Sequence, residues 1–225
     1  MKQNGHAIMV NGNDTEETAG NHVSVPFEKL MASKESVPDD ETKIKLISYH
    51  FRQIMLLLGL DLGDDSLKGT PDRVAKMYVK EIFSGLDPAN KPDVTLFEND
   101  YHYGEMLIEK NITVYSCCEH HFVPIIGKAH VAYYPNGNVI GLSKINRLVH
   151  YYCKKPQVQE RLTVQIAKAL KEALHTEDVA VVIDAAHLCV ASRGVGDVNS
   201  TTVTGHYSGK FKNDATRKEF LSFLK

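Results

Sequence analysis

Residues 106–138 read MLIEKNITVYSCCEHHFVPIIGKAHVAYYPNGN, and this stretch decides the class of the fold. Its segments 106–116 and 129–134 are rich in β-branched and aromatic residues, which are typical of strands. Residues 135–138, Pro-Asn-Gly-Asn, form a turn signal between two strand-like runs, so a β-hairpin is predicted there. The middle of the chain is therefore predicted to form a sheet.

Helical patterns come before this stretch. Apolar side chains recur at helical spacing between Asp40 and Gly59. Thr70 and Pro71 then predict the start of a second helix, with Thr70 as its N-cap, that ends at Gly85. The chain before the sheet is thus expected to be helical.

The chain after residue 138 mixes both kinds of element. The patterns predict helices over residues 145–152 and 158–173, one long strand over 179–191, a shorter strand over 203–207 and a closing helix over 213–224. Strands and helices mix without strict βαβ alternation, so the predicted fold class is α+β.

The composition sets limits on function. The chain has 225 residues, of which 43% are hydrophobic and 24% charged, as in ordinary globular proteins. Its formal net charge of −2 gives no overall basic field, so neither nucleic acid nor a membrane surface is an expected partner. No run approaches the ~20 apolar residues of a membrane-spanning helix. Residues 1–40 are polar and aperiodic and are predicted to form a flexible tail, and the expected location is the cytoplasm.

The chemistry concentrates in two short segments, CEHH at 118–121 and AHLC at 186–189. A Cys and a His three residues apart are a weak zinc signal by themselves. Because side chains at i and i+2 of a strand share a face, His187 and Cys189 are expected side by side on the predicted strand. By the same alternation, Cys117 is expected to point away from the cysteine that follows it and to be a small buried side chain.

Cys118, His121 and Cys189 supply three ligands for a tetrahedral Zn²⁺. Three protein ligands plus water make a catalytic site, in which the bound water ionises near neutral pH. His120 and His187 are then left to transfer protons. The alternative is a closed structural site in which one of these two histidines is the fourth ligand. The spacing alone leaves both possibilities open.

A candidate anion site follows the predicted sheet. Residues 141–147, GLSKINR, run from a strand into a helix, and Ser143 is the predicted N-cap. Lys144 and Arg147 share a face beside this helix N-terminus, which suits a phosphate group. The alternative is a basic helix face that only contacts solvent.

Four more charged side chains are candidates whose positions are ordinary when each is taken singly. Arg193 comes just after the predicted metal strand, and Arg73 and Lys76 form another basic pair near a helix start. Glu160 lies off the apolar stripe of its helix, as an exposed surface carboxylate also would. Neither G-x-x-x-x-G-K-[ST] nor G-x-G-x-x-G occurs, so any nucleotide is held in another way.

Taken together, these segments resemble the GTP cyclohydrolase I family. The similar segments are GTPDRVAKMY at 69–78, SxCEHH at 116–121, GLSKINR at 141–147, PQVQERL at 156–162 and HLC at 187–189 with Arg193-Gly194. They occur in order, and the resemblance runs from about residue 40 to the C-terminus.

The resemblance implies a tunnelling fold, in which an antiparallel sheet backed by helices follows an N-terminal helical part. It implies that residues 41–225 are the catalytic domain, with 41–90 as the helical part and 91–225 as the tunnelling-fold part. It also implies a homodecamer, in which the sheets of the subunits join into a barrel and the active sites lie between subunits.

The resemblance further implies a hydrolase that converts GTP and water into 7,8-dihydroneopterin triphosphate and formate, the first step of pterin and tetrahydrofolate synthesis. Zn²⁺ would be bound by Cys118, His121 and Cys189, and His120 and His187 would transfer protons. The implied substrate-binding residues are Glu160 and Gln159 for guanine, and Ser143, Lys144, Arg147, Arg193, Arg73 and Lys76 for the triphosphate.

Two other functions compete with this one. Another tunnelling-fold enzyme, a 7-cyano-7-deazaguanine reductase, uses a cysteine nucleophile with NADPH and lacks the three zinc ligands. A catalytically silent homologue would keep zinc for assembly or partner binding alone. The presence of both His120 and His187 beside a complete set of ligands favours the hydrolase.

Overall fold

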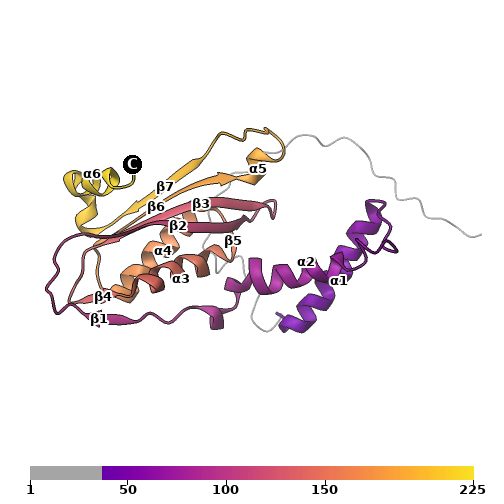
Figure 1. Cartoon of the computed structure of the whole chain (residues 1–225), viewed down its shortest axis with the longest axis horizontal. Helices are drawn as coiled ribbons and strands as arrows, with labels where there is room; N and C mark the ends of the chain where they lie inside the picture. The colour runs from indigo at the N-terminus through magenta and orange to yellow at the C-terminus, as the bar shows by residue number, and fades with distance from the viewer. Residues whose placement is uncertain (1–36) are drawn as a thin grey trace, which may run out of the picture. The chain divides into compact units, whose positions relative to one another are not determined.

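The structure, a computed structural model, describes residues 37–225 (Figure 1). The flexible tail predicted for residues 1–40 lies outside this range as far as residue 36. In the described part, two helices precede a five-stranded sheet, and later helices pack against that sheet.

The first helix, α1 (Asp40–Leu57), has clear signals at both ends. The carboxylate of Asp39 accepts a hydrogen bond from the Thr42 N–H at 2.8 Å, which caps its N-terminus. Just after its C-terminus, Gly59 has a φ of 80°, a conformation that suits glycine. The helix predicted between Asp40 and Gly59 is therefore confirmed.

The second helix, α2 (Thr70–Met77), begins one residue earlier than its predicted start. Gly69 occupies the cap position that the sequence assigns to Thr70, and no side chain caps the helix. The Thr70 hydroxyl accepts a hydrogen bond from the Arg73 guanidinium instead, at 2.8 Å. The predicted single helix to Gly85 is also interrupted after Met77. It continues as a π-helical turn, η3 (Tyr78–Ile82), and two 3-10 turns, η4 (Ser84–Leu86) and η5 (Pro88–Asn90).

The large sheet has the strand order β5-β2-β3-β6-β7. Neighbouring strands run antiparallel, except that the short β5 is parallel to β2. The strands are β2 (Leu107–Cys118), β3 (Pro124–Tyr133), β5 (Pro156–Gln157), β6 (Val179–His187) and β7 (Thr202–Tyr207). The predicted α+β class, with an antiparallel sheet after a helical part, is confirmed.

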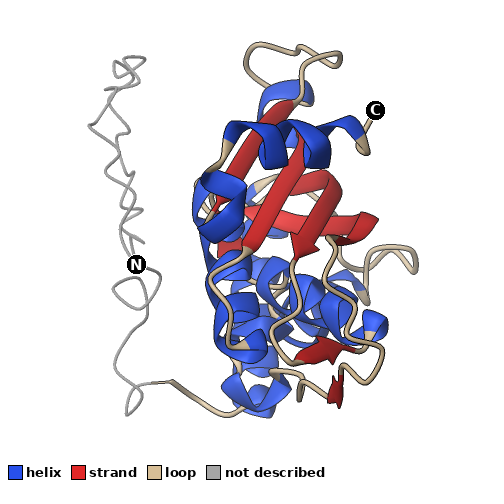
Figure 2. Ribbon diagram, turned by 90° about the vertical axis from the view of Figure 1, so that its left-hand side faces the viewer, coloured by secondary structure: helices blue, strands red, loops and turns tan. Residues whose placement is uncertain are grey.

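The β-hairpin predicted at residues 135–138 is wrong. β4 (Asn138–Ile140) pairs with β1 (Leu96–Glu98) in a separate two-stranded sheet, which lies apart from the large sheet in Figure 2. Both edges of β3 are already occupied, by β2 and β6, so the chain has to leave the large sheet after Tyr133. A turn does form there, with Gly137 at a φ of 75°.

Helices α3 (Leu142–Cys153) and α4 (Gln159–Leu174) cover one face of the large sheet (Figure 1). Along β6, Val181 packs into this main core, while Val182 faces a smaller cluster beneath α6 (Asp214–Ser222). Successive strand residues point to opposite faces, so a strand that is apolar throughout can serve both clusters. The main core therefore fixes the strand ends that carry the candidate site.

The chain closes with the 3-10 turn η6 (Gly209–Lys212) and α6, which confirms the predicted closing helix. None of the helices within residues 37–225 is both long enough and apolar enough to cross a membrane.

Candidate active site

Three side chains from two segments that are distant in sequence meet at one end of the large sheet. Potential ligand atoms of Cys118, His121 and Cys189 all lie within 4.8 Å of one another. Cys118 is the last residue of β2, His121 lies in the connection to β3, and Cys189 belongs to the short helix α5 (Leu188–Ala191). The group is the predicted set of zinc ligands.

The turn between β2 and β3 places two of these ligands together. The Phe122 N–H donates to the Cys118 carbonyl at 2.9 Å, and the Cys118 N–H donates to the Val123 carbonyl at 2.8 Å. Phe122 takes a φ of 55°, an unusual value for a residue that is not glycine. This tight turn brings the His121 imidazole back to Cys118, so that its Nδ1 lies 3.8 Å from the cysteine Sγ.

The predicted strand over residues 179–191 is too long. β6 ends at His187, and the chain then turns into α5, whose end is held by the Ser192 N–H donating to the Leu188 carbonyl at 2.9 Å. The argument that His187 and Cys189 share one strand face is therefore wrong. Cys189 reaches the other two ligands because β6 ends beside the start of β3, where Ile125 pairs with His187.

The three residues fit a zinc ion. Zinc bonds of about 2.1 Å to nitrogen and 2.3 Å to sulfur place neighbouring tetrahedral ligands about 3.6 Å apart, close to the 3.8 Å between Cys118 Sγ and His121 Nδ1. Burial, and then the nearby Cys118 thiol, raises the pKa of Cys189. A bound cation reverses this effect because a coordinating thiol loses its proton outright. Two thiolates and an imidazole are donors that suit Zn²⁺.

The geometry favours an open site over a closed one. Nδ1 of His120 also lies 3.8 Å from Cys118 Sγ, but His120 is not part of the group of mutually close ligand atoms. Cys117 is also outside that group, and burial raises the pKa of its thiol to about 11. The expectation that Cys117 is a small buried side chain is confirmed.

A hydrogen bond to a buried amide fixes the orientation of His187. Its Nε2 lies 2.7 Å from Oε1 of Gln159, which is only 1% exposed. The Gln159 amide nitrogen donates to the carbonyls of Ile183 and Thr202 at 3.1 and 2.8 Å, so its oxygen is the atom that faces the ring. An amide oxygen only accepts, so Nε2 of His187 carries a proton and Nδ1 of the neutral ring holds a lone pair.

Burial lowers the pKa of His187, while the Glu160 carboxylate acts in the opposite direction. Burial dominates, so the neutral ring is favoured. Glu160 itself is exposed in the first turn of α4, one residue after Gln159. The family resemblance implies that both residues bind guanine. The structure shows Gln159 bonded to His187, and a direct contact of either residue with guanine stays a prediction.

The predicted phosphate-binding residues fall into three places. Arg193 joins the metal centre, where its Nη1 donates to His121 Nε2 at 2.9 Å. A neutral ring that accepts this bond carries its proton on Nδ1, the nitrogen that lies nearer the Cys118 Sγ.

Ser143, Lys144 and Arg147 lie on the first two turns of α3. Ser143 is exposed and is not the N-cap, because Gly141 occupies that position and no side chain caps the helix. The N-terminus of α3 thus keeps backbone N–H groups that a ligand can use.

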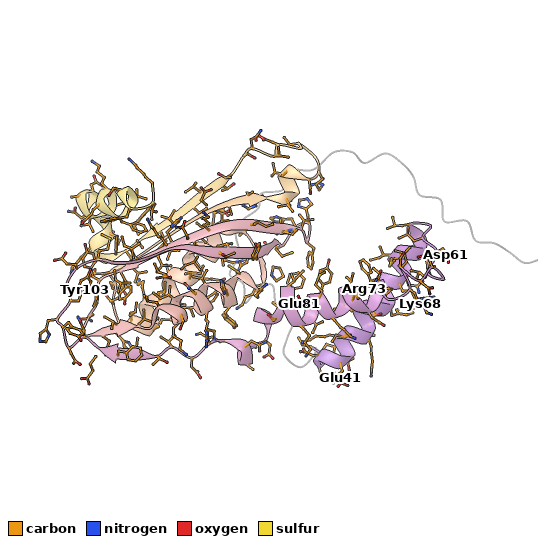
Figure 3. The ribbon with its side chains drawn as sticks, viewed as in Figure 1. Glu41, Asp61, Lys68, Arg73, Glu81 and Tyr103 are labelled. Atoms are coloured by element: carbon orange, nitrogen blue, oxygen red, sulfur yellow. The ribbon has the colours of Figure 1, made fainter. Side chains whose placement is uncertain are left out.

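Arg73 and Lys76 belong to α2. Figure 3 shows Arg73 within the helical part, and its guanidinium donates to the Ser66 carbonyl at 2.9 Å and to the Thr70 hydroxyl. Lys76 is exposed. A role for either residue in phosphate binding stays a prediction.

The motif spacing predicts no role for two further residues near the site. Arg161 is buried and forms an ion pair with Glu119, which lies between Cys118 and His120. Both residues stand inside the segments that the sequence singles out, CEHH and PQVQERL, and a charged residue on the buried side of a helix is the signal that points to them.

Comparison with known proteins gives a consistent result. The family model described as GTP cyclohydrolase I matches residues 47–225. The chain is 56% identical over 218 residues to GTP cyclohydrolase 1 of Flavobacterium johnsoniae, covering 96% of this chain and 98% of that protein. It is 57% identical over 186 residues to GTP cyclohydrolase 1 of Vibrio parahaemolyticus, covering 82% and 86% of the two chains.

A solved structure of the archaeosine synthase QueF-Like in the apo form is similar with a TM-score of 0.39 and 18% identity, over 46% of this chain and 93% of that one. This similarity is too low to bear on function. The match to the family model covers most of the chain, and so do the matches to its curated relatives. The chain belongs to the GTP cyclohydrolase I family.

Proposed function

We propose that this chain is a zinc-dependent GTP cyclohydrolase, which converts GTP and water into 7,8-dihydroneopterin triphosphate and formate. This reaction is the first step of pterin and tetrahydrofolate synthesis. Membership of the family supports the proposal. The observation that carries it is the open group of three ligands, Cys118, His121 and Cys189, with His120 and His187 at the same end of the sheet.

The two histidines beside the proposed zinc centre have separate roles in proton transfer. When bound, zinc supplies a Lewis acid that lets water attack C8 of guanine near neutral pH. His187 offers Nδ1 as a proton acceptor, because its Nε2–H is donated to Gln159. His120, which is exposed beside Cys118, is the second proton-transfer group.

Glu160 and the other predicted binding residues would hold the substrate. Glu160 would accept hydrogen bonds from the N–H groups of guanine, and adenine would leave this carboxylate without donors. Ser143, Lys144, Arg147 and Arg193 would bind the triphosphate through charge-assisted hydrogen bonds. These cations would allow the chain to bind a polyanionic substrate although its net charge is −2.

The proposed assembly is a homodecamer whose sheets join into a barrel, with active sites between subunits. Within the described residues, Met55 is the buried residue of α1, and Leu46, Ile54, Leu57 and Leu58 are exposed. An apolar helix surface of this kind supports burial against another subunit. Arg73 and Lys76 would then serve the site of a neighbouring subunit. Analytical ultracentrifugation should give the mass of ten chains.

The proposed location is the cytoplasm. The four cysteines, Cys117, Cys118, Cys153 and Cys189, are all free thiols in the structure. A reducing compartment preserves free thiols, and two of these are needed as metal ligands.

The reaction is tested with the assembled full-length protein and GTP, with and without prior removal of zinc. Formate release and pterin fluorescence after oxidation are followed together. The proposal expects both products from the zinc-loaded protein and neither after chelation. Cys118→Ala should abolish zinc binding and both products. Cys153→Ala, a change at a buried cysteine outside the ligand group, should retain them.

Two results would contradict the proposal. Formate without a pterin would indicate an enzyme that opens the ring but does not reclose it. Neither product from a zinc-loaded decamer would indicate a catalytically silent homologue.

A further inference from the structure

The first turn of α4 sends adjacent side chains to different parts of the site. Gln159 bonds to His187, at the end of β6, and Arg161 bonds to Glu119, in the turn after β2. Glu160, between them, is exposed. The segment that carries the proposed guanine-binding residue is therefore tied to both groups of catalytic side chains.

Arg161 is held in a buried polar network. Its side chain is only 6% exposed, against 21% for Glu119. Its Nε donates to Oε1 of Gln157 at 3.1 Å, and its Nη2 donates to the Pro156 carbonyl at 3.3 Å and to the Glu119 carboxylate. These bonds hold the Arg161 side chain in one geometry. Removing Glu119 or Arg161 would leave the other charge without its partner.

Glu119 is attached to the same segment twice. Its carboxylate meets Arg161, and its backbone N–H donates to the Gln157 carbonyl at 3.0 Å. The other carboxylate oxygen, Oε1, lies 3.8 Å from Nε2 of His120. Glu119 directly follows one ligand, Cys118, and precedes another, His121, by two positions, so its anchoring limits the movement of both.

We propose that Glu119 and Arg161 are positioning residues, whose ion pair holds residues 118–122 in the conformation that presents Cys118 and His121 to a metal ion. This inference rests on the proposed zinc centre. The pair acts through its neighbours Cys118, His120 and His121. It also keeps His120 at a fixed place relative to Glu160, because Arg161 follows Glu160 in α4.

The test compares Glu119→Gln and Arg161→Lys with the full-length wild-type protein. Glu119→Gln keeps an acceptor but removes the charge, and Arg161→Lys keeps the charge but removes the planar fork of donors. Zinc affinity is measured by competition with a chelator. The absorption spectrum of the Co²⁺-loaded protein reports the geometry around the metal.

We expect both variants to fold, to bind zinc 10–100-fold more weakly and to shift the Co²⁺ spectrum, as changes around metal ligands do. The double variant Glu119→Ala with Arg161→Ala should lose no more affinity than Arg161→Ala alone, because the two act as one unit. The matched control is Glu172→Gln. Glu172 pairs with Lys168 on the outer side of the same helix, where both are exposed, so zinc affinity should not change.

A second measurement separates this inference from the proposed zinc centre. Hydrogen exchange of the Cys118 and Phe122 amides is measured in the chelator-treated protein, and it should be faster in both variants than in the wild type. If the wild type binds no zinc, the zinc centre fails and the exchange rates alone decide the positioning role. Zinc affinity and exchange rates that match the wild type, with only a lower melting temperature, would show that the pair is merely structural.

Discussion

At the scale of single residues, Gln159 shows how a side chain hidden from solvent can set the chemistry of an exposed site. Its amide nitrogen is oriented by the carbonyls of Ile183 and Thr202, which leaves its oxygen to face His187. The position of the proton on the imidazole is thereby decided by the groups that accept hydrogen bonds from this amide nitrogen, which also include the Thr204 hydroxyl. A residue of the same size without an acceptor would lose this control.

Gln159→Leu is therefore predicted to lower kcat by roughly 10–100-fold, with a smaller change in KM, because the orientation of His187 is lost while Glu160 and the predicted phosphate-binding residues remain. The NMR shifts of the His187 ring nitrogens should change as the proton is no longer fixed on Nε2. Lys168→Gln, a change at an exposed position further along α4, is the matched control and should leave kcat and the imidazole shifts unchanged. Equal kcat in Gln159→Leu and the wild type would contradict the prediction.

The group of three candidate metal ligands could be predicted from residue types and spacing, but one of them for the wrong reason. Cys118 and His121 lie in one local turn, so their three-residue spacing is sufficient. The strand pattern predicts Cys189 beside His187 on one face, whereas the chain turns into α5 between them. The contact of Gln159 with His187 joins residues 28 positions apart. No local pattern carries that contact, because it depends on how α4 packs against β6.

At the scale of elements, the predicted strands and helices are mostly present, and the errors fall where tertiary pairing decides. The turn at residues 135–138 has the composition of a hairpin, but the neighbouring edge of β3 is taken by β6, which lies more than forty residues further along the chain. Local sequence signals predict that a turn forms, but they do not predict which strand pairs with β3. The same holds for the end of β6, where the ladder with β3 stops at Ile125 and His187.

Gly127 is the element-scale feature that keeps β3 and β6 close enough to assemble the site. A Cβ at this position would lie 2.1 Å from the Asp184 carbonyl oxygen and 2.5 Å from the Ala185 Cα. Backbone atoms cannot move aside without separating the strands. Gly127→Ala is predicted to lower the free energy of unfolding by about 3 kcal/mol or more, and to weaken zinc binding because Cys189 follows β6.

Urea denaturation and chelator competition measure these two effects. Gly137→Ala provides the control, since Gly137 has a φ of 75° and no atom lies within 4 Å of an added Cβ. It should cost about 1–2 kcal/mol of backbone strain without changing zinc affinity. A stable Gly127→Ala protein with normal zinc affinity would show that the two strands can separate locally without disturbing the site.

At the scale of the whole molecule, a buried and a half-buried histidine outside the site, His130 and His206, link the free energy of unfolding to pH. Burial lowers the pKa of His130, assisted by Lys128 and Lys110 and opposed by Asp184. Burial also lowers the pKa of His206, whose Nε2 is buried without a hydrogen-bond partner. Lys171 and Lys212 add to that effect, and Glu177 opposes it. Both rings are therefore more stable neutral in the folded chain than in the unfolded one.

The sign of the pH dependence follows from this difference. Above the unfolded pKa of about 6.5, the rings are neutral in both the folded and the unfolded chain, so their titration does not change the free energy of unfolding. As the pH falls through this value the unfolded chain binds protons first, and stability continues to fall until the pH is below the lowered folded pKa.

We predict that the free energy of unfolding in urea decreases between pH 7.5 and pH 5. His206→Gln should reduce that decrease, because a neutral side chain replaces one that must bind a proton. His150→Gln, a change at an exposed position on α3, should leave the decrease as it is in the wild type. If His206→Gln and His150→Gln have the same pH dependence, the loss of stability in acid comes from other groups, and the burial of His206 has no part in it.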